Sequence, residues 1–271
     1  MLVIPETIGH GGQYQSNLTA AARNGATVTC GTANTKGSYA SLVDPTSNPS
    51  YGVWVRVRGI SVSATVTSFL LDIAYGPTGG GNEQVIIPNL DCWGANLNLQ
   101  GKLFFFPVYI PSGVRVSARA QSATASKTGV VAIWLAQDPP YGFVGGRVEA
   151  YGAVLTTSLG TSVTPASGAF GSWTQLVAST LRAHRFWTAG YDALSDTTTT
   201  SQQLLLELGV GPDASNVSPI YSGSCSTDSN ENVESLFPLI SYAPVPSGKA
   251  IFARIASGET EARGVVAYGV D

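Results

Sequence analysis

The chain has 271 residues, of which 44% are hydrophobic and only 11% are charged, and its net charge is −3. An ordinary soluble domain carries about 25% charged residues, so we expect much of the surface to be buried against other subunits. The chain has no run of Lys or Arg, which excludes nucleic-acid binding through phosphate neutralisation, and its apolar runs are far shorter than the roughly 18 residues of a membrane span.

The N-terminal segment MLVIPETIGHGGQ has neither a basic region nor a long apolar stretch. We therefore expect no signal peptide and synthesis in the cytoplasm. Cys30, Cys92 and Cys225 lie far apart without a CxxC pair, which is typical of small buried hydrophobic residues. His10 and His184 are too few for a three-histidine metal site, and we interpret each as a surface or hydrogen-bonded structural histidine.

Short alternating segments predict β-strands. In VWVRVR (53–58) and VRVSARA (114–120), apolar residues alternate with polar ones, so one face of each strand is expected to be buried. VVAIWLA (130–136) indicates a fully buried strand, and each Pro-Ser-Gly indicates a tight turn. Helical periodicity is scarce. About eight short strands in each half favour an all-β chain with jelly-roll-like β-sandwiches.

One long stretch is written twice. Without a gap, Ile110–Leu135 aligns with Val245–Val270 at an offset of 135, with ten identities in 26 positions. Two further blocks keep the same order, LDIAYGP (71–77) with LELGVGP (206–212) and GSYASL (37–42) with GSWTQL (171–176). We conclude that the chain is a tandem duplication. The expected domains are a first sandwich at 1–136, a linker at 137–149 and a second sandwich at 150–271.

The duplication also predicts two equivalent ion pairs. Asp72 and Glu207 occupy matching positions, as do Arg119 and Arg254. We expect a cross-strand carboxylate–arginine pair on the outer face of each sandwich. An exposed pair of this kind contributes about 0.2–1 kcal/mol, so we interpret it as a device that fixes strand register.

No segment carries a catalytic or cofactor motif. GPTGGGNEQV (76–85) is glycine-rich, but no helix pattern follows it, and PSGK (246–249) lacks the first glycine and the hydroxyl of a phosphate-binding loop. DSNENVE (228–234) superficially resembles a calcium loop but lacks the required glycine and glutamate, which leaves only a looser calcium site open. We predict no catalytic residues, no cofactor and no metal.

Exposed aromatic rings are the remaining candidates for binding, because a ring can stack on a sugar. Trp93 lies in a loop that differs between the halves, and we take it as the first candidate, with Trp54 and the polar loop at Asp228 as further interaction residues. Trp173 aligns with Tyr39, which indicates packing shared by the two halves instead.

The strand–turn–strand block IPSGVRVSARAQSATAS, followed by an apolar strand, resembles sequences of structural proteins from the heads and tails of tailed bacteriophages. The resemblance implies a non-enzymatic virion component, either a head-decoration protein or a tail or connector accessory protein, bound to other structural proteins. We expect a homo-oligomer, a trimer or a hexamer. Three chains would present six similar sandwiches, which suits a sixfold ring.

Two other functions stay open. A glycan- or receptor-binding module of the same particle, with a host surface glycan as ligand, would carry exposed aromatic residues at one end of a sandwich. A glycan hydrolase would need two carboxyl groups about 5–10 Å apart in a cleft.

Overall fold

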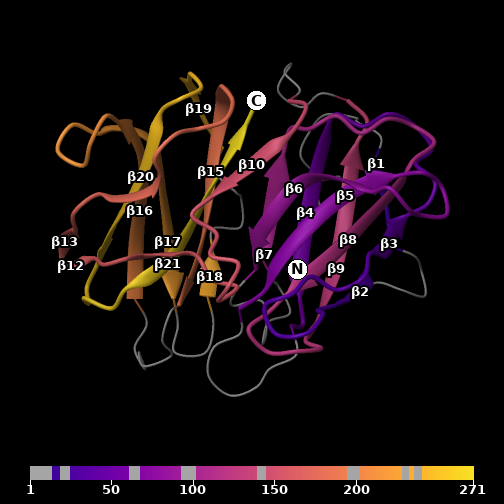
Figure 1. The fold of residues 1–271 in the computed structure, drawn as a ribbon, viewed down its shortest axis with the longest axis horizontal. Coiled ribbons are helices and arrows are strands. Elements are labelled where there is room, and N and C mark those ends of the chain that lie inside the picture. Colours follow the sequence, from indigo (N-terminus) through magenta and orange to yellow (C-terminus); the bar gives the residue numbers. More distant parts are fainter. Residues whose placement is uncertain are drawn as a thin grey trace.

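In the described part of the structure, a computed structural model, all regular secondary-structure elements are β-strands. This part therefore contains no helix that could cross a membrane. The described residues are 14–18, 25–60, 68–92, 102–138, 145–193, 202–227, 232–234 and 240–271. The strands form two sandwiches side by side along the long axis of the molecule (Figure 1). The all-β prediction is confirmed.

The first sandwich packs two antiparallel sheets. Sheet I has the order β1-β9-β4-β7, with β2 also on β9, and sheet II has the order β3-β8-β5-β6. The strands are β1 (Tyr14–Ser16), β2 (Ala26–Thr29), β3 (Ala40–Val43), β4 (Gly52–Arg58), β5 (Leu70–Gly76), β6 (Gln84–Asp91), β7 (Lys102–Phe106), β8 (Arg115–Gln121) and β9 (Thr128–Ala136).

The second sandwich repeats this arrangement. Sheet III has the order β10-β21-β15-β19, with β11 also on β21, and sheet IV has the order β12-β13-β20-β16-β17-β18, with β14 also on β20. The strands are β10 (Val148–Tyr151), β11 (Thr161–Val163), β12 (Ala166–Ser167), β13 (Ala169–Phe170), β14 (Thr174–Val177), β15 (His184–Ala193), β16 (Gln202–Gly211), β17 (Ser218–Thr227), β18 (Asn232–Glu234), β19 (Ser241–Val245), β20 (Ala250–Ser257) and β21 (Arg263–Val270).

The two strand orders are equivalent. β2-β9-β4-β7 facing β3-β8-β5-β6 corresponds to β11-β21-β15-β19 facing β14-β20-β16-β17. This is the double Greek-key order of a jelly roll. Even an irregularity recurs, because β3 shifts register against β8 between Ser41 and Val43, and β14 shifts against β20 between Gln175 and Val177. A shared bulge of this kind supports a common origin for the halves.

The repeated Pro-Ser-Gly turns have the same local chemistry. Gly113 and Gly248 have φ angles of 73° and 79°, a left-handed conformation that glycine adopts at little cost. Their N–H groups donate to the carbonyl oxygens of Thr46 and Thr180 at 2.9 and 2.8 Å. Each threonine hydroxyl donates in turn to the carbonyl oxygen of the turn proline. The turn was therefore duplicated together with a distant residue that holds it.

The gap-free alignment is wrong in the last strand of each half. Trp54 pairs with Trp134 in sheet I. Thr188, the residue of β15 that is equivalent to Trp54 and lies 134 residues after it, pairs with Tyr268 in sheet III, so β21 corresponds to β9 at an offset of 134. The gap-free sequence alignment instead makes Val131 equivalent to Val266, at an offset of 135 residues. A slip of one residue exchanges the two faces of a strand. The match misled because β21 is buried on both faces, so its apolar residues do not alternate with polar ones.

Candidate interaction surfaces

The two sandwiches of the chain contact each other through a shared apolar surface. β6 and β7 are edge strands of sheets II and I, and the outer face of sheet III covers both edges (Figure 1). Four residues of sheet III, Val148, Val266, Tyr268 and Val270, belong to the core of the first sandwich. An antiparallel sheet usually leaves one face to solvent, whereas β21 of sheet III is buried on both faces.

Tyr268 is the central residue of this interface. Its side chain has no exposed surface, and its ring meets Phe104 and Phe106 edge-on, at centroid distances of 6.5 and 5.8 Å. Its hydroxyl accepts the backbone N–H of Asp91 at 2.7 Å and donates to the carbonyl oxygen of Asn89 at 3.1 Å. The hydroxyl thus satisfies polar backbone groups of an edge strand that would otherwise be buried without partners.

Two further polar contacts fix the position of the sandwiches. The buried Lys102 donates from Nζ to the carbonyl oxygen of Tyr191 at 2.9 Å and lies 4.9 Å from that ring. At the other side, Gln121 Nε2 donates to the carbonyl oxygen of Leu155 at 2.8 Å and to the hydroxyl of Ser158 at 3.0 Å. The interface therefore joins an apolar centre to specific hydrogen bonds, the usual composition of a stable protein interface.

The predicted ion pairs lie on the outer faces of sheets II and IV. Asp72 pairs with Arg119 across β5 and β8, with Arg119 Nε 3.0 Å from Oδ2. Lys36 Nζ also lies 2.8 Å from Asp72 Oδ1, and the Asn89 N–H donates to the same oxygen. Asp72 is buried rather than exposed, and the ring of Tyr39 lies under the Arg119 guanidinium at 4.7 Å.

The second copy keeps the pair but changes its surroundings. Arg254 Nη2 lies 2.6 Å from Glu207 Oε2, and the guanidinium carbon lies 4.6 Å from the centre of the Phe170 ring and 4.3 Å from that of the Trp173 ring. Trp173 therefore contacts Arg254 as Tyr39 contacts Arg119, so both halves pack an aromatic ring against the equivalent arginine. Phe170 replaces Lys36, which makes this face aromatic where that of the first sandwich is charged.

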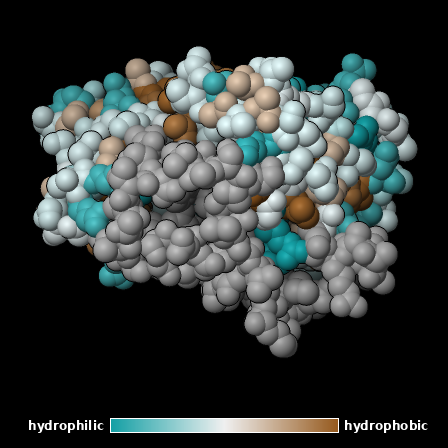
Figure 2. Space-filling model, turned by 90° about the horizontal axis from the view of Figure 1, so that it is seen from below, coloured by the Kyte–Doolittle hydropathy of each residue, from teal (hydrophilic) through white to brown (hydrophobic). Residues whose placement is uncertain are grey.

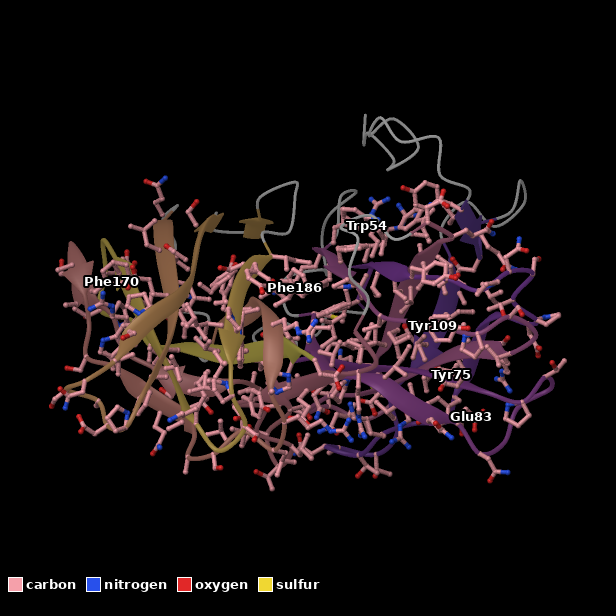
Figure 3. All side chains as sticks on the ribbon, turned by 90° about the horizontal axis from the view of Figure 1, so that it is seen from above. Trp54, Tyr75, Glu83, Tyr109, Phe170 and Phe186 are labelled. Carbon is pink, nitrogen blue, oxygen red and sulfur yellow. The ribbon has the colours of Figure 1, made fainter. Side chains whose placement is uncertain are left out.

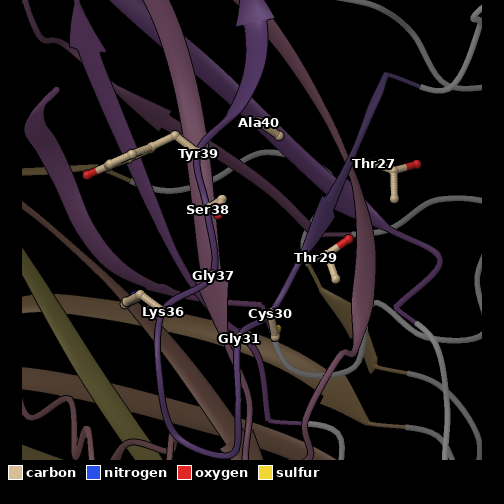
Figure 4. Close-up of a pocket in the computed structure, with 9 residues that line it drawn as sticks. All are labelled: Thr27, Thr29, Cys30, Gly31, Lys36, Gly37, Ser38, Tyr39 and Ala40. Carbon is tan, nitrogen blue, oxygen red and sulfur yellow. The ribbon is translucent and has the colours of Figure 1, made fainter. Parts of the chain in front are cut away.

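An open groove of about 610 Å³ lies between the edge strands β2 and β3. Hydroxyl side chains line it, from Thr27, Thr29 and Ser38. Lys36 and Tyr39 contribute to its wall but project away from Thr27 and Thr29 (Figure 4). The Cys30 thiol borders the groove and is buried, which raises its pKa to about 12, so it is no nucleophile at neutral pH.

His184 is a buried structural histidine. Its Nε2 lies 2.7 Å from the hydroxyl of Tyr151 and 3.2 Å from Glu149 Oε2. Arg182 bridges Glu149 and Asp271 at 3.5 and 3.4 Å. Burial lowers the pKa of His184, although Glu149 opposes the shift, so the folded protein keeps the imidazole neutral where an unfolded chain takes up a proton. The cluster lies within the second sandwich and contains no nucleophile.

This burial predicts a pH dependence of stability. Because the folded pKa of His184 is below the unfolded value of about 6.5, stability is lost as the pH falls below that value, by at most about 1.4 kcal/mol per pH unit. H184Q should flatten the dependence between about pH 6.5 and 5, measured by urea unfolding, whereas H10Q serves as the control. Equal slopes for H184Q and the unsubstituted protein would show that His184 does not take part.

The other predicted interaction residues have different outcomes. Trp54 is half-buried on the outer face of sheet I, with its ring 4.7 Å from that of Phe105. Trp93 and Asp228 lie outside the described residues. Of the labelled aromatic residues, Trp54, Tyr75 and Tyr109 lie on the first sandwich, Phe186 lies near the middle of the molecule and Phe170 lies at the far end of the second sandwich (Figure 3). Among the described residues, no three His, Cys, Asp or Glu side chains are grouped so that they could hold a metal ion.

Sequence reasoning missed the residues that join the halves, above all Tyr268 and Lys102. One signal was available, because RGVVAYGV (263–270) is nearly all apolar where an outer strand face should be polar. The visible face in Figure 2 agrees with the low charge of the chain. Its described residues are mostly pale or teal, and brown forms small separate spots.

No protein-family model matches the chain, and no curated protein matches it in sequence. Among solved structures, the CBM22-1–CBM22-2 tandem domain of Paenibacillus barcinonensis Xyn10C aligns over 96% of this chain and 90% of that one, with 13% identity and a TM-score of 0.26. The infectious bursal disease virus Gx strain aligns over 96% and 72%, with 9% identity and a TM-score of 0.21. A triple jelly roll from an archaeal virus aligns over 91% and 58%, with 12% identity and a TM-score of 0.20. Likeness at this level carries no argument about function.

Proposed function

We propose that the protein is a non-enzymatic structural component of a bacteriophage particle, a head-decoration protein or a tail or connector accessory protein. The supporting observation is the covering of the β6 and β7 edges by the outer face of sheet III. One jelly roll of this chain thus binds another through an apolar centre with hydrogen bonds around it. A chain with so few charges suits repeated contacts of this kind with copies of itself and with other virion proteins.

Glycan or receptor binding is the second candidate. The groove between β2 and β3 favours it, because a volume of about 610 Å³ bordered by several hydroxyl groups suits a hydroxylated ligand. In this reading the chain is an adhesive part of the same particle.

Purified phage particles from cells that carry the gene provide the test. We expect the protein in a fixed ratio to the main shell or tail protein, with cross-links to other structural proteins in mass spectrometry. A glycan array probed with the isolated protein distinguishes the second candidate, since T27A and T29A should abolish glycan binding only if the groove is the site. Absence of the protein from purified particles would overturn the structural role.

A further inference from the structure

The outer face of sheet IV brings charged and hydroxyl side chains together on one surface. Arg254 of β20 pairs with Glu207 of β16, and Glu207 pairs in turn with Ser222 of β17. Side chains that stand opposite one another in register share a face of the sheet, so these three form a row across the strands. Ser222 is exposed, and the two charged groups are partly exposed. The row therefore presents a hydroxyl group, a carboxylate and a guanidinium to solvent.

A second row lies beside the first and is partly apolar. Phe170 of β13 pairs with Ala256, Ala256 pairs with Leu205, and Leu205 pairs with Ser224. Phe170 is half-buried, Leu205 is 43% exposed and Ser224 is exposed. Gln203, which precedes Leu205 by two residues and so lies on the same face of β16, is exposed as well. Phe170 places this row at the far end of the second sandwich, away from the first (Figure 3).

The indole of Trp173 extends over the same face. Trp173 precedes β14, yet a Cβ atom on Gly209 of β16 would lie 3.0 Å from Trp173 Cη2. The glycine therefore leaves the space that the indole occupies. Trp173 is half-buried, so part of its ring is open to solvent beside Arg254. The equivalent positions of the first sandwich hold the smaller ring of Tyr39 and an alanine, Ala74.

The first sandwich does not offer such a face. Leu70 has the same register as Leu205 but has no exposed surface. Where Phe170 contacts the arginine of the second sandwich, the first sandwich has Lys36 beside its buried carboxylate, Asp72. The open, aromatic surface is therefore specific to the second half of the chain, and it provides one candidate binding face per chain.

The composition of this face suits a neutral sugar. A sugar ring has C–H groups that pack on aromatic rings and hydroxyl groups that exchange hydrogen bonds with amide, hydroxyl and carboxylate groups. Within β13, β14, β16, β17 and β20, the charged residues are Glu207 and Arg254, and they neutralise each other. Because polar side chains interrupt the apolar ones, the face lacks the continuous apolar centre that is typical of a permanent protein interface.

We infer that the outer face of sheet IV binds a neutral glycan. Sugar rings pack on Trp173 and Phe170, and their hydroxyl groups bond to the exposed polar side chains of β16 and β17. The contact between Arg254 and the two aromatic rings holds this surface in place before the ligand arrives, which lowers the entropic cost of binding. The inference goes beyond the proposed structural role and uses a different surface from the groove between β2 and β3.

The test is binding of the purified 271-residue chain to an array of neutral, sialylated and sulfated oligosaccharides, followed by calorimetric titration with the neutral oligosaccharide that binds best. We expect neutral oligosaccharides to bind without any gain from acidic groups. F170A and W173A should each weaken binding by about tenfold or more, and Q203A combined with S222A by about fivefold or more. Y39A is the matched control, because it removes the equivalent ring from the equivalent arginine of the first sandwich and should leave the affinity unchanged.

Tryptophan fluorescence distinguishes contact with the sugar from a change of fold. Titration with the same oligosaccharide should change the emission of the unsubstituted protein and of W54F, whereas W173F, which keeps an aromatic ring, should bind without that change. Q203A and S222A alter only exposed side chains, so their effect does not depend on folding.

Three results would overturn the inference: no binding of a neutral oligosaccharide, full affinity in both F170A and the Q203A/S222A variant, or a preference for acidic sugars. Loss of binding in T27A and T29A, with F170A unaffected, would also overturn it and would assign the sugar to the groove instead. Incorporation into particles is measured separately, so the structural role and this binding face can fail independently.

Discussion

Replacement of Asp72 by alanine is expected to lower the free energy of unfolding by about 3 kcal/mol, because it leaves the partly buried charges of Lys36 and Arg119 without their buried counter-ion. Asp72 Oδ1 accepts from Lys36 and from the N–H of Asn89, while Oδ2 accepts from Arg119. Burial already lowers the pKa of Lys36, and the nearby carboxylate of Asp72 opposes that shift. Without Asp72, the Lys36 ammonium group loses its counter-ion and keeps only the carbonyl oxygen of Leu70 as acceptor, and the Asn89 N–H loses the carboxylate to which it donates. Urea unfolding measures the loss.

The duplication supplies the matched control. E207A removes the equivalent carboxylate, which is 17% exposed where Asp72 is 5% exposed, and Arg254 keeps its contacts with the rings of Phe170 and Trp173, so we expect a loss of about 1 kcal/mol or less. Replacing Lys36 by methionine in the D72A background should recover part of the stability, since the uncompensated charge is then removed. Equal losses for D72A and E207A would show that burial of the first pair does not matter.

Replacement of Tyr268 by alanine should also destabilise the protein by about 3–5 kcal/mol, as expected for a large aromatic residue removed from a packed core. The ring fills the space between Phe104 and Phe106, and the hydroxyl bonds two backbone groups of β6. The substitution removes contacts between the sandwiches rather than within one. We therefore expect the single unfolding transition of the unsubstituted protein to separate into two, measured by scanning calorimetry.

Two other tyrosine variants separate packing from hydrogen bonding. Y268F keeps the ring but leaves the Asp91 N–H and the Asn89 carbonyl without the hydroxyl, which should cost about 1–3 kcal/mol. Y242A, at an exposed tyrosine of the same half, should cost less than about 1 kcal/mol. A Y268A protein as stable as Y242A would show that the interface does not couple the two halves.

The repeated turn and its flanking strands were predictable from sequence because their determinants are local. Pro fixes one φ angle, Gly113 and Gly248 supply another, and alternation defines the strand that follows. The register of that strand was also accessible, since Asp72 with Arg119 and Glu207 with Arg254 stand opposite one another at the same offset. The partner of the turn was not accessible, because Thr46 lies more than sixty residues before the Pro111 carbonyl to which it donates.

The last strand shows where sequence matching fails. GVVA occurs at 129–132 and again at 264–267. The third residue, Val131, faces the core of its sandwich in the first copy, whereas the second and fourth residues, Val265 and Ala267, do so in the second copy. The loop before β21 is one residue shorter than the loop before β9, which shifts the equivalence of the two strands by one residue. The identical residues GVVA hide this shift in a sequence alignment. A strand that is apolar on both sides has no periodicity from which its register can be read.

The sequence by itself determined the all-β class, the duplication and the cross-strand arginine pairs, because alternation, turn residues and a fixed offset are encoded along the chain. The tertiary structure alone decided that the two sandwiches share a core and that Asp72 is buried beside Lys36. Both depend on contacts between segments far apart in sequence. Such contacts follow from the packing of whole sheets, and a single sequence contains no local pattern that specifies them.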